Sequence, residues 1–143
     1  MLNLAYKNEL FKLRDDLSLQ GAAHFMAEIT PDFLRDEVIA DFYRLADALI
    51  LPSREEGFGI PLIEAAFSSI PVFCADIPVL RELGGEDVSY FDPDASPERI
   101  SAQIASRLTS ETTSRWGRRA KQSFTWDSIY DIHIEPLIQE VIR

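Results

Sequence analysis

The sequence contains a single cysteine, Cys74, among its 143 residues. One cysteine cannot form an internal disulfide, so we expect a reducing compartment and, most simply, a cytoplasmic location. The neighbours of Cys74 are apolar, which favours a small buried hydrophobe over a reactive thiol. The sequence also lacks an apolar run near the roughly 18 residues of a membrane-spanning helix, and its first residues lack the basic and apolar regions of a signal peptide. We therefore expect no transmembrane segment.

Positive charge is also scarce, with 14 Lys and Arg against 24 Asp and Glu and a net charge of −10. Affinity for nucleic acid depends on clustered basic residues, so no nucleic-acid partner is expected. The densest basic group is interpreted as a solvated helix face and comprises Arg115, Arg118, Arg119 and Lys121. The apolar content of 46% excludes disorder as a global description, and the length corresponds to one domain.

Short apolar runs alternate with segments of helical spacing along the chain. Strands are predicted over residues 22–26, 48–51, 71–75 and 88–91. Helices are predicted over 6–17, 36–46, from 61 onward, 78–83, 97–108 and 126–141, the last divided at Pro136, and Trp116 and Trp126 are expected to anchor the core. This alternation predicts an α/β fold, a Rossmann-like parallel sheet with flanking helices. Such sheets bind ligands at the carboxyl ends of their strands.

A glycine-containing segment follows the most apolar predicted strand. Gly57 and Gly59 allow a ligand to approach the backbone closely, and Pro61 suits the first position of a helix. The amides of Leu62, Ile63 and Glu64 are then expected to lack intrahelical partners. Free amides at the positive end of a helix dipole favour an anion, typically phosphate.

Two carboxylates flank this helix start, Glu56 before the glycines and Glu64 after them. Carboxylates accept hydrogen bonds from paired hydroxyls, so a ligand with a phosphate centre and hydroxyl-rich ends, such as a nucleotide sugar, would fit. Simpler interpretations remain open: Ser53 and Glu56 also fit a helix capping box, Glu64 could be a solvated helix residue, and Phe58 could be packed in the loop.

The segment from Pro52-Ser53 through Glu56-Gly57-Phe58-Gly59-Ile60-Pro61-Leu62-Ile63-Glu64-Ala65 resembles the motif of retaining glycosyltransferases of family 4, in which seven residues separate two glutamates. The resemblance covers roughly residues 6–143. It includes, in the family's order, Tyr6–Leu19, His24-Phe25-Met26, Phe42–Ala48, Pro71-Val72, Asp76-Ile77-Pro78, Arg81-Glu82, Gly84-Gly85, Phe91-Asp92-Pro93 and Phe124-Thr125-Trp126.

This resemblance implies that residues 1–143 form a partial nucleotide-sugar-binding domain, the C-terminal part of a two-domain GT-B enzyme. By analogy, Glu64 would hold the ribose hydroxyls. Glu56 would be catalytic, contacting the transferred sugar and stabilising positive charge at its anomeric carbon. The other residues expected to contact the sugar donor are Ser53, Gly57, Phe58, Gly59, Ile60 and Leu62. No metal or other cofactor is implied, since the nucleotide sugar is a substrate, and the acceptor is unknown.

The sequence departs from the family's pattern in extent and at two positions. The acceptor-binding N-terminal domain and the first strands of the donor-binding domain are absent, so we expect a fragment that is inactive by itself, with an incomplete or re-paired sheet. Ala27 and Ser69 stand where the family usually has glycine. At Ala27 the departure affects an expected close contact with the sugar donor. At Ser69 it affects only a local turn.

The resulting hypothesis is part of a glycosyltransferase that transfers a sugar from a nucleotide sugar to an acceptor with retention of configuration. A non-catalytic nucleotide-sugar-binding module is an alternative. A glycoside hydrolase is a second alternative, with Glu56 and Glu64 as an acid/base pair. That chemistry needs carboxyl groups roughly 5–9.5 Å apart across a sugar, and an opposed placement is unfavourable for two residues on one loop–helix segment.

Overall fold

The structure is a computed structural model that describes residues 4–30, 32–108 and 124–142. It divides the chain into two compact units, Met1–Arg35 and Asp36–Arg143. The first unit contains helices α1 (Leu4–Asp16) and α2 (Met26–Ile29). Arg14 of α1 donates two hydrogen bonds to Glu28 of α2, at 2.6 and 2.9 Å, and the rings of Phe11 and Phe25 lie 5.1 Å apart. An ion pair and a ring contact therefore hold this unit's two helical segments together.

The strand predicted over residues 22–26 is wrong. Residues 22–25 lie in turns and loop, and Met26 begins α2. The amides of Ala22 and Ala23 donate to the carbonyl of Leu19 at 2.9 and 2.8 Å, so this backbone finds its partners locally. A strand needs a neighbouring strand to pair its backbone groups, and all the strands that the structure describes lie in the second unit.

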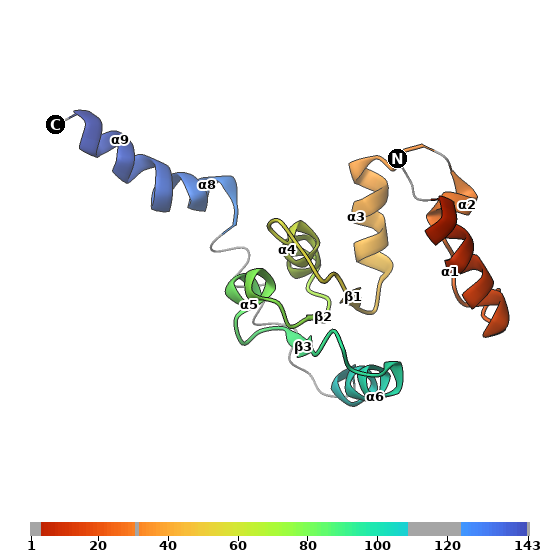
Figure 1. The fold of residues 1–143 in the computed structure, drawn as a ribbon. Coiled ribbons are helices and arrows are strands. Elements are labelled where there is room, and N and C mark those ends of the chain that lie inside the picture. Colours follow the sequence, from red (N-terminus) through yellow and green to blue (C-terminus); the bar gives the residue numbers. More distant parts are fainter. Residues whose placement is uncertain (1–3, 31, 109–123, 143) are drawn as a thin grey trace. The chain divides into compact units, whose positions relative to one another are not determined.

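The second unit is built on a parallel sheet of strands β1 (Leu49–Leu51), β2 (Val72–Ala75) and β3 (Ser89–Phe91), in the order β1-β2-β3 (Figure 1). Leu49 pairs with Val72, and Phe73 pairs with Ser89, so β2 is paired on both sides. These three strands confirm the predictions over 48–51, 71–75 and 88–91. The expected α/β fold with a parallel sheet and flanking helices is confirmed.

The helices of this unit precede, connect and follow the three strands along the chain. They are α3 (Asp36–Leu45), α4 (Ile60–Phe67), α5 (Pro78–Gly84), α6 (Pro97–Leu108), α8 (Trp126–Ile129), the π-helix η1 (Tyr130–Ile134) and α9 (Glu135–Ile142). Among the helices that the structure describes, none has the length and apolar character needed to cross a membrane.

Strand β2 is buried on both faces and forms the centre of the core. On one face, Cys74 and its neighbours pack against α4 and α5, with Leu62 and Leu80 fully buried. On the other face, Phe73 packs with Ile100 and Ile104 of α6, which lies across the sheet from α4 in Figure 1. Burial, followed by the nearby Asp76 carboxylate, raises the pKa of the Cys74 thiol to about 12. The expectation that Cys74 is a small buried residue of the core is confirmed.

Helix α4 ends in a tight turn at Ser69, whose φ is +58°. The amide of Ile70 donates to the carbonyl of Ala65 at 3.3 Å, and the amide of Ser69 donates to the carbonyl of Ala66 at 3.1 Å. This pair of bonds is the Schellman motif, whose left-handed residue is usually glycine. Ser69 therefore occupies a position where the backbone favours glycine.

The last described segment is divided as predicted, although the division precedes the proline. The π-helix η1 ends at Ile134, and α9 begins one residue before Pro136. Proline cannot donate to the carbonyl four residues earlier, and its ring disfavours the regular turn, so the preceding turn widens. Trp126 is 82% exposed, so the expectation that it anchors the core is wrong. Trp116 and the basic group at 115–121 lie outside the described residues.

Candidate functional site

The loop after β1 leads into α4 through Gly59, which has a left-handed φ of +81°. A side chain at this position would place Cβ 2.9 Å from Cδ2 of Leu80 and 3.3 Å from Cδ2 of Leu83. Both the backbone angle and the contact with α5 therefore require glycine here. Gly57 differs, since an added Cβ would meet no heavy atom within 4 Å. The space beside Gly57 is open to a ligand.

The backbone amides at this helix start are arranged differently from the prediction. Helix α4 begins at Ile60, with Pro61 second, and the amide of Leu62 donates to the carbonyl of Gly59 at 3.0 Å. The expectation that the Leu62 amide lacks a partner is wrong, because the first turn tightens onto Gly59. The leucine side chain is itself fully buried in the core.

The amides without partners lie one turn earlier. Among the described residues, the N–H groups of Gly57, Phe58, Gly59 and Ile60 donate no hydrogen bond. The side chains of Phe58 and Ile60 are 56% and 59% exposed, so Phe58 is not a packed loop residue. Gly59 is buried, whereas Gly57, Phe58 and Ile60 are exposed. The exposed residues offer amides at the positive end of the helix beside exposed apolar side chains, which suits an anionic ligand with an apolar or sugar portion.

Glu56 lies in this loop, two residues before Phe58. The capping-box interpretation is wrong, because residues 53–56 are outside any helix and the N-cap of α4 is Gly59. Within the described part of the chain, neither Ser53 nor Glu56 has a hydrogen-bond or ion-pair partner. The Glu56 carboxylate is half-buried and uncommitted.

Glu64 lies in the second turn of α4 and is held by another helix. Its Oε2 accepts a hydrogen bond from the hydroxyl of Tyr43 on α3 at 3.0 Å, and the same hydroxyl lies 3.4 Å from the carbonyl oxygen of Pro61. Glu64 is half-buried, so the interpretation as a solvated helix residue does not hold. Burial, the hydrogen bond to Glu64 and its negative charge all raise the pKa of Tyr43, so the hydroxyl stays protonated and donates.

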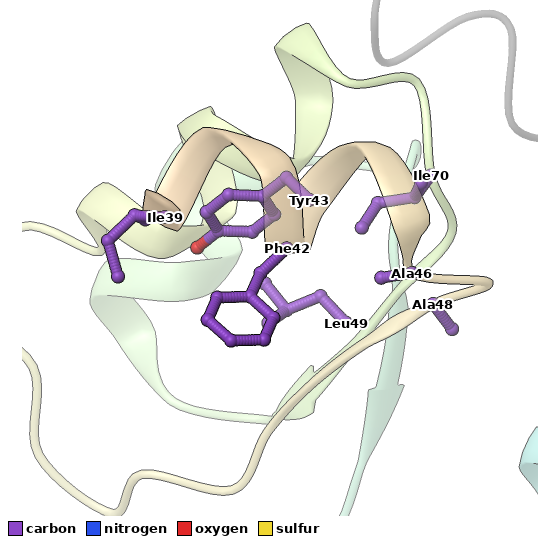
Figure 2. Close-up of a pocket in the computed structure, with 7 residues that line it drawn as sticks. All are labelled: Ile39, Phe42, Tyr43, Ala46, Ala48, Leu49 and Ile70. Carbon is purple, nitrogen blue, oxygen red and sulfur yellow. The ribbon is translucent and has the colours of Figure 1, made fainter. Parts of the chain in front are cut away.

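Two cavities lie along α3, and Tyr43 lines both. A cavity of about 250 Å³ is lined by apolar side chains, among them Phe42, Leu49 and Ile70, together with Tyr43 (Figure 2). A second cavity of about 440 Å³ is more polar and includes Glu64. It is lined by Asp36, Ile39, Ala40, Tyr43, Arg44, Glu64, Phe67 and Ser68.

Sequence reasoning missed Tyr43. The residue falls in a segment of helical spacing, where an aromatic side chain is ordinarily part of the core. Its role depends on the contact between α3 and α4, which are separated by a strand and a loop. No local pattern identifies such a contact.

The arginines near the carboxyl ends of the strands are engaged with acidic groups. Arg54 binds Asp94 at 2.6 Å and the carbonyl of Pro93 at 2.9 Å, which ties the loop after β1 to the turn after β3. Arg81 forms two 2.6 Å hydrogen bonds with Asp76, directly after β2, and holds the pKa of that carboxyl below its usual range. Among the described residues of this loop, backbone amides are therefore the uncommitted groups for an anion. Among the described residues, no three His, Cys, Asp or Glu side chains are grouped as metal ligands.

Comparison with known proteins decides the family. The sequence profile described as "Glycosyl transferases group 1" matches residues 5–123, most of the chain. This chain belongs to the group 1 glycosyl transferases.

Relatives of this group 1 chain include named sugar transferases. It is 47% identical over 69 residues to the serotype-specific mannosyltransferase WbdA of Escherichia coli. The aligned segment covers 48% of this chain and 8% of that protein. The chain is 38% identical over 89 residues to the O-antigen chain mannosyltransferase RfbU of Salmonella typhimurium, covering 62% of this chain and 24% of that protein. The group 1 chain thus spans less than a third of the length of these relatives.

A solved structure has the same fold as this group 1 chain. Sucrose-phosphate synthase from Thermosynechococcus elongatus superposes with a TM-score of 0.72 at 21% identity, covering 96% of this chain and 35% of that chain. The expected GT-B type of α/β fold is confirmed, and at this identity the likeness concerns the fold alone.

Proposed function

We propose that this chain supplies part of the nucleotide-sugar site of a glycosyltransferase that transfers a sugar with retention of configuration. The observation that carries the proposal is the run of amides from Gly57 to Ile60, which have no partner among the described residues and lie between Glu56 and Glu64 in the sequence. Membership in the group 1 family supports it.

In this proposal the sugar donor lies across the start of α4. The amides of the exposed residues Gly57, Phe58 and Ile60 bind the diphosphate, whose negative charge the helix dipole stabilises as the leaving group departs. Glu64 accepts hydrogen bonds from the ribose hydroxyls, while Ser53, Phe58 and Ile60 contact the donor from the loop. Leu62 contributes only by fixing the helix start, because its side chain and its amide are both engaged.

Glu56 is proposed to act on the transferred sugar. Its carboxylate has no partner among the described residues and precedes the free amides by one residue, so it can face the sugar end of the donor. There it would stabilise positive charge that develops at the anomeric carbon. We propose that no metal takes part, because the amides supply the positive potential at the diphosphate.

The names of the relatives suggest where to look for the sugar. WbdA and RfbU are mannosyltransferases, so a mannosyl nucleotide is the first donor to test. The acceptor is proposed to bind to a domain supplied by the rest of the protein, since this chain spans a small part of its relatives.

Calorimetric titration of the 143-residue chain with GDP, UDP and GDP-mannose tests the proposal. We expect at least one nucleotide to bind, and Glu64→Gln to weaken that binding. Sugar transfer is then measured in a polypeptide that includes the rest of the enzyme, with Glu56→Gln as the inactivated variant. No nucleotide binding by an ordered chain would overturn the proposal.

The same experiment distinguishes the alternatives. Nucleotide-sugar binding without transfer in the longer polypeptide would favour the binding module. Glycoside hydrolysis that Glu64→Gln abolishes while sugar binding is retained would favour the hydrolase.

A further inference from the structure

The two carboxylate oxygens of Glu64 have different surroundings. Oε2 accepts the hydrogen bond from Tyr43 at 3.0 Å. Oε1 has no partner among the described residues. An ionised carboxylate accepts about four hydrogen bonds, so most of its capacity remains for a ligand.

We propose that Tyr43 is a positioning residue: its hydroxyl fixes the orientation of the Glu64 carboxylate so that both oxygens can accept hydrogen bonds from the two ribose hydroxyls of the sugar donor. This inference rests on the proposed function. The chain's preference for a ligand with two ribose hydroxyls would then depend on the hydrogen bond between Tyr43 of α3 and Glu64 of α4, and not on Glu64 alone.

The position of the Tyr43 hydroxyl is set by packing. The ring packs against the buried core cluster that includes Leu62 and Ala65. A tyrosine has two side-chain torsions, so a packed ring holds its hydroxyl in one place. A glutamate has three side-chain torsions. Without the hydrogen bond from Tyr43, Glu64 would lose more conformational freedom on binding a ligand than it does when Tyr43 already holds it.

The other charged groups along the polar cavity do not replace this contact. Arg44 donates to Asp41 at 2.7 Å on its own helix. Asp36, at the start of α3, carries the same charge as Glu64 and cannot donate to it when ionised. Tyr43 is therefore the group on α3 that holds the carboxylate.

Tyr43→Phe tests the inference, because it keeps the ring and removes the hydroxyl. For the wild-type chain and the variant, the affinities for GDP and for its 2′,3′-dideoxy analogue are measured by calorimetry, and UDP with its analogue is used if UDP binds better. The preference for the ribose form is expected to fall about fivefold to tenfold in the variant, as the loss of one well-oriented hydrogen bond predicts. Binding of the dideoxy form is expected to change little.

Tyr90→Phe is the matched control. The hydroxyl of Tyr90 donates to the carbonyl of Leu80 at 3.2 Å, so this variant also loses one partly buried hydrogen bond. It should retain the ribose preference of the wild-type chain. A general loss of stability would reduce both affinities together and would leave their ratio unchanged.

A double-mutant cycle completes the test. In a Glu64→Gln background, Tyr43→Phe should cause little further loss of ribose preference, because both changes act on one interaction. A Tyr43→Phe chain that keeps the full preference, or that does not fold, would overturn the inference and leave the proposed function standing. A wild-type chain that binds no nucleotide, or has no ribose preference, would overturn both.

Discussion

The loop Pro52–Gly59 and the contact between α3 and α4 lie at the same helix start, yet they are built by opposite means. In the loop, the groups left for a ligand are backbone amides, and the carboxylate of Glu56 has no partner among the described residues. Between the helices, Glu64 is held by a packed tyrosine. The loop therefore depends on backbone angles, whereas the helix contact depends on the identity of two side chains.

The largest expected effect compares the two loop glycines. Gly59→Ala should destabilise the chain by roughly 2–3 kcal/mol, because the left-handed φ disfavours a side chain and Cβ would press on Leu80. Gly57→Ala should change stability by less than about 1 kcal/mol. Urea unfolding of both variants provides the measurement. Equal effects would mean that the loop is not held against α5.

The next effect compares the two glutamates. Glu64→Gln should weaken GDP binding about tenfold, the loss of a charge-assisted hydrogen bond to ribose. Glu56→Gln should leave GDP affinity within about twofold, because GDP lacks the sugar that Glu56 is proposed to contact. Calorimetric titration measures both constants. If Glu56→Gln weakened GDP binding as much as Glu64→Gln, the assigned roles would be wrong.

A smaller effect is expected at the far end of α4. Ser69→Gly should stabilise the chain by roughly 0.5–1 kcal/mol, because glycine adopts the φ of +58° without strain. This net value already includes the opposing cost of glycine's greater conformational entropy in the unfolded chain. Thermal and urea unfolding measure the change. Nucleotide affinity should not change, which separates this position from the site. A destabilised Ser69→Gly chain would contradict the assignment of backbone strain.

The smallest effect concerns the ion pair of Asp76 and Arg81 and its dependence on pH. Pairing lowers the pKa of Asp76, so the stabilisation is present above the unfolded pKa of about 4 and is lost as the pH falls through the lower folded value. Asp76→Asn should therefore lower the melting temperature slightly at pH 7. The difference from wild type should shrink as the pH falls below the unfolded pKa of about 4. A difference independent of pH would show that the charge of Asp76 is not its cause.

Local chemistry predicted much of the second unit. The three strands were predicted from short apolar runs, and α6 begins where Ser96 precedes Pro97, with the Ser96 hydroxyl accepting from the amide of Arg99 at 3.4 Å. Helix α5 ends at the Gly84-Gly85 pair. In each case a residue's own backbone preference and its immediate neighbours decide the structure.

The rest required tertiary information. The apolar run at 22–26 is not a strand, because its amides bond within a turn and no described strand of that unit is present to pair with it. The Leu62 amide was misjudged because the left-handed Gly59 tightens the first turn by one residue. The hydrogen bond from Tyr43 to Glu64 crosses 21 positions of sequence and has no local signature.

The contact between Gly59 and Leu80 couples two positions that belong to different helices. Because Leu80 and Leu83 occupy the space that a side chain at position 59 would need, a substitution at position 59 depends on the residues at positions 80 and 83. Position 57 has no such dependence, since an added Cβ there would meet no heavy atom within 4 Å. The start of α4 and the core face of α5 therefore constrain each other's side chains.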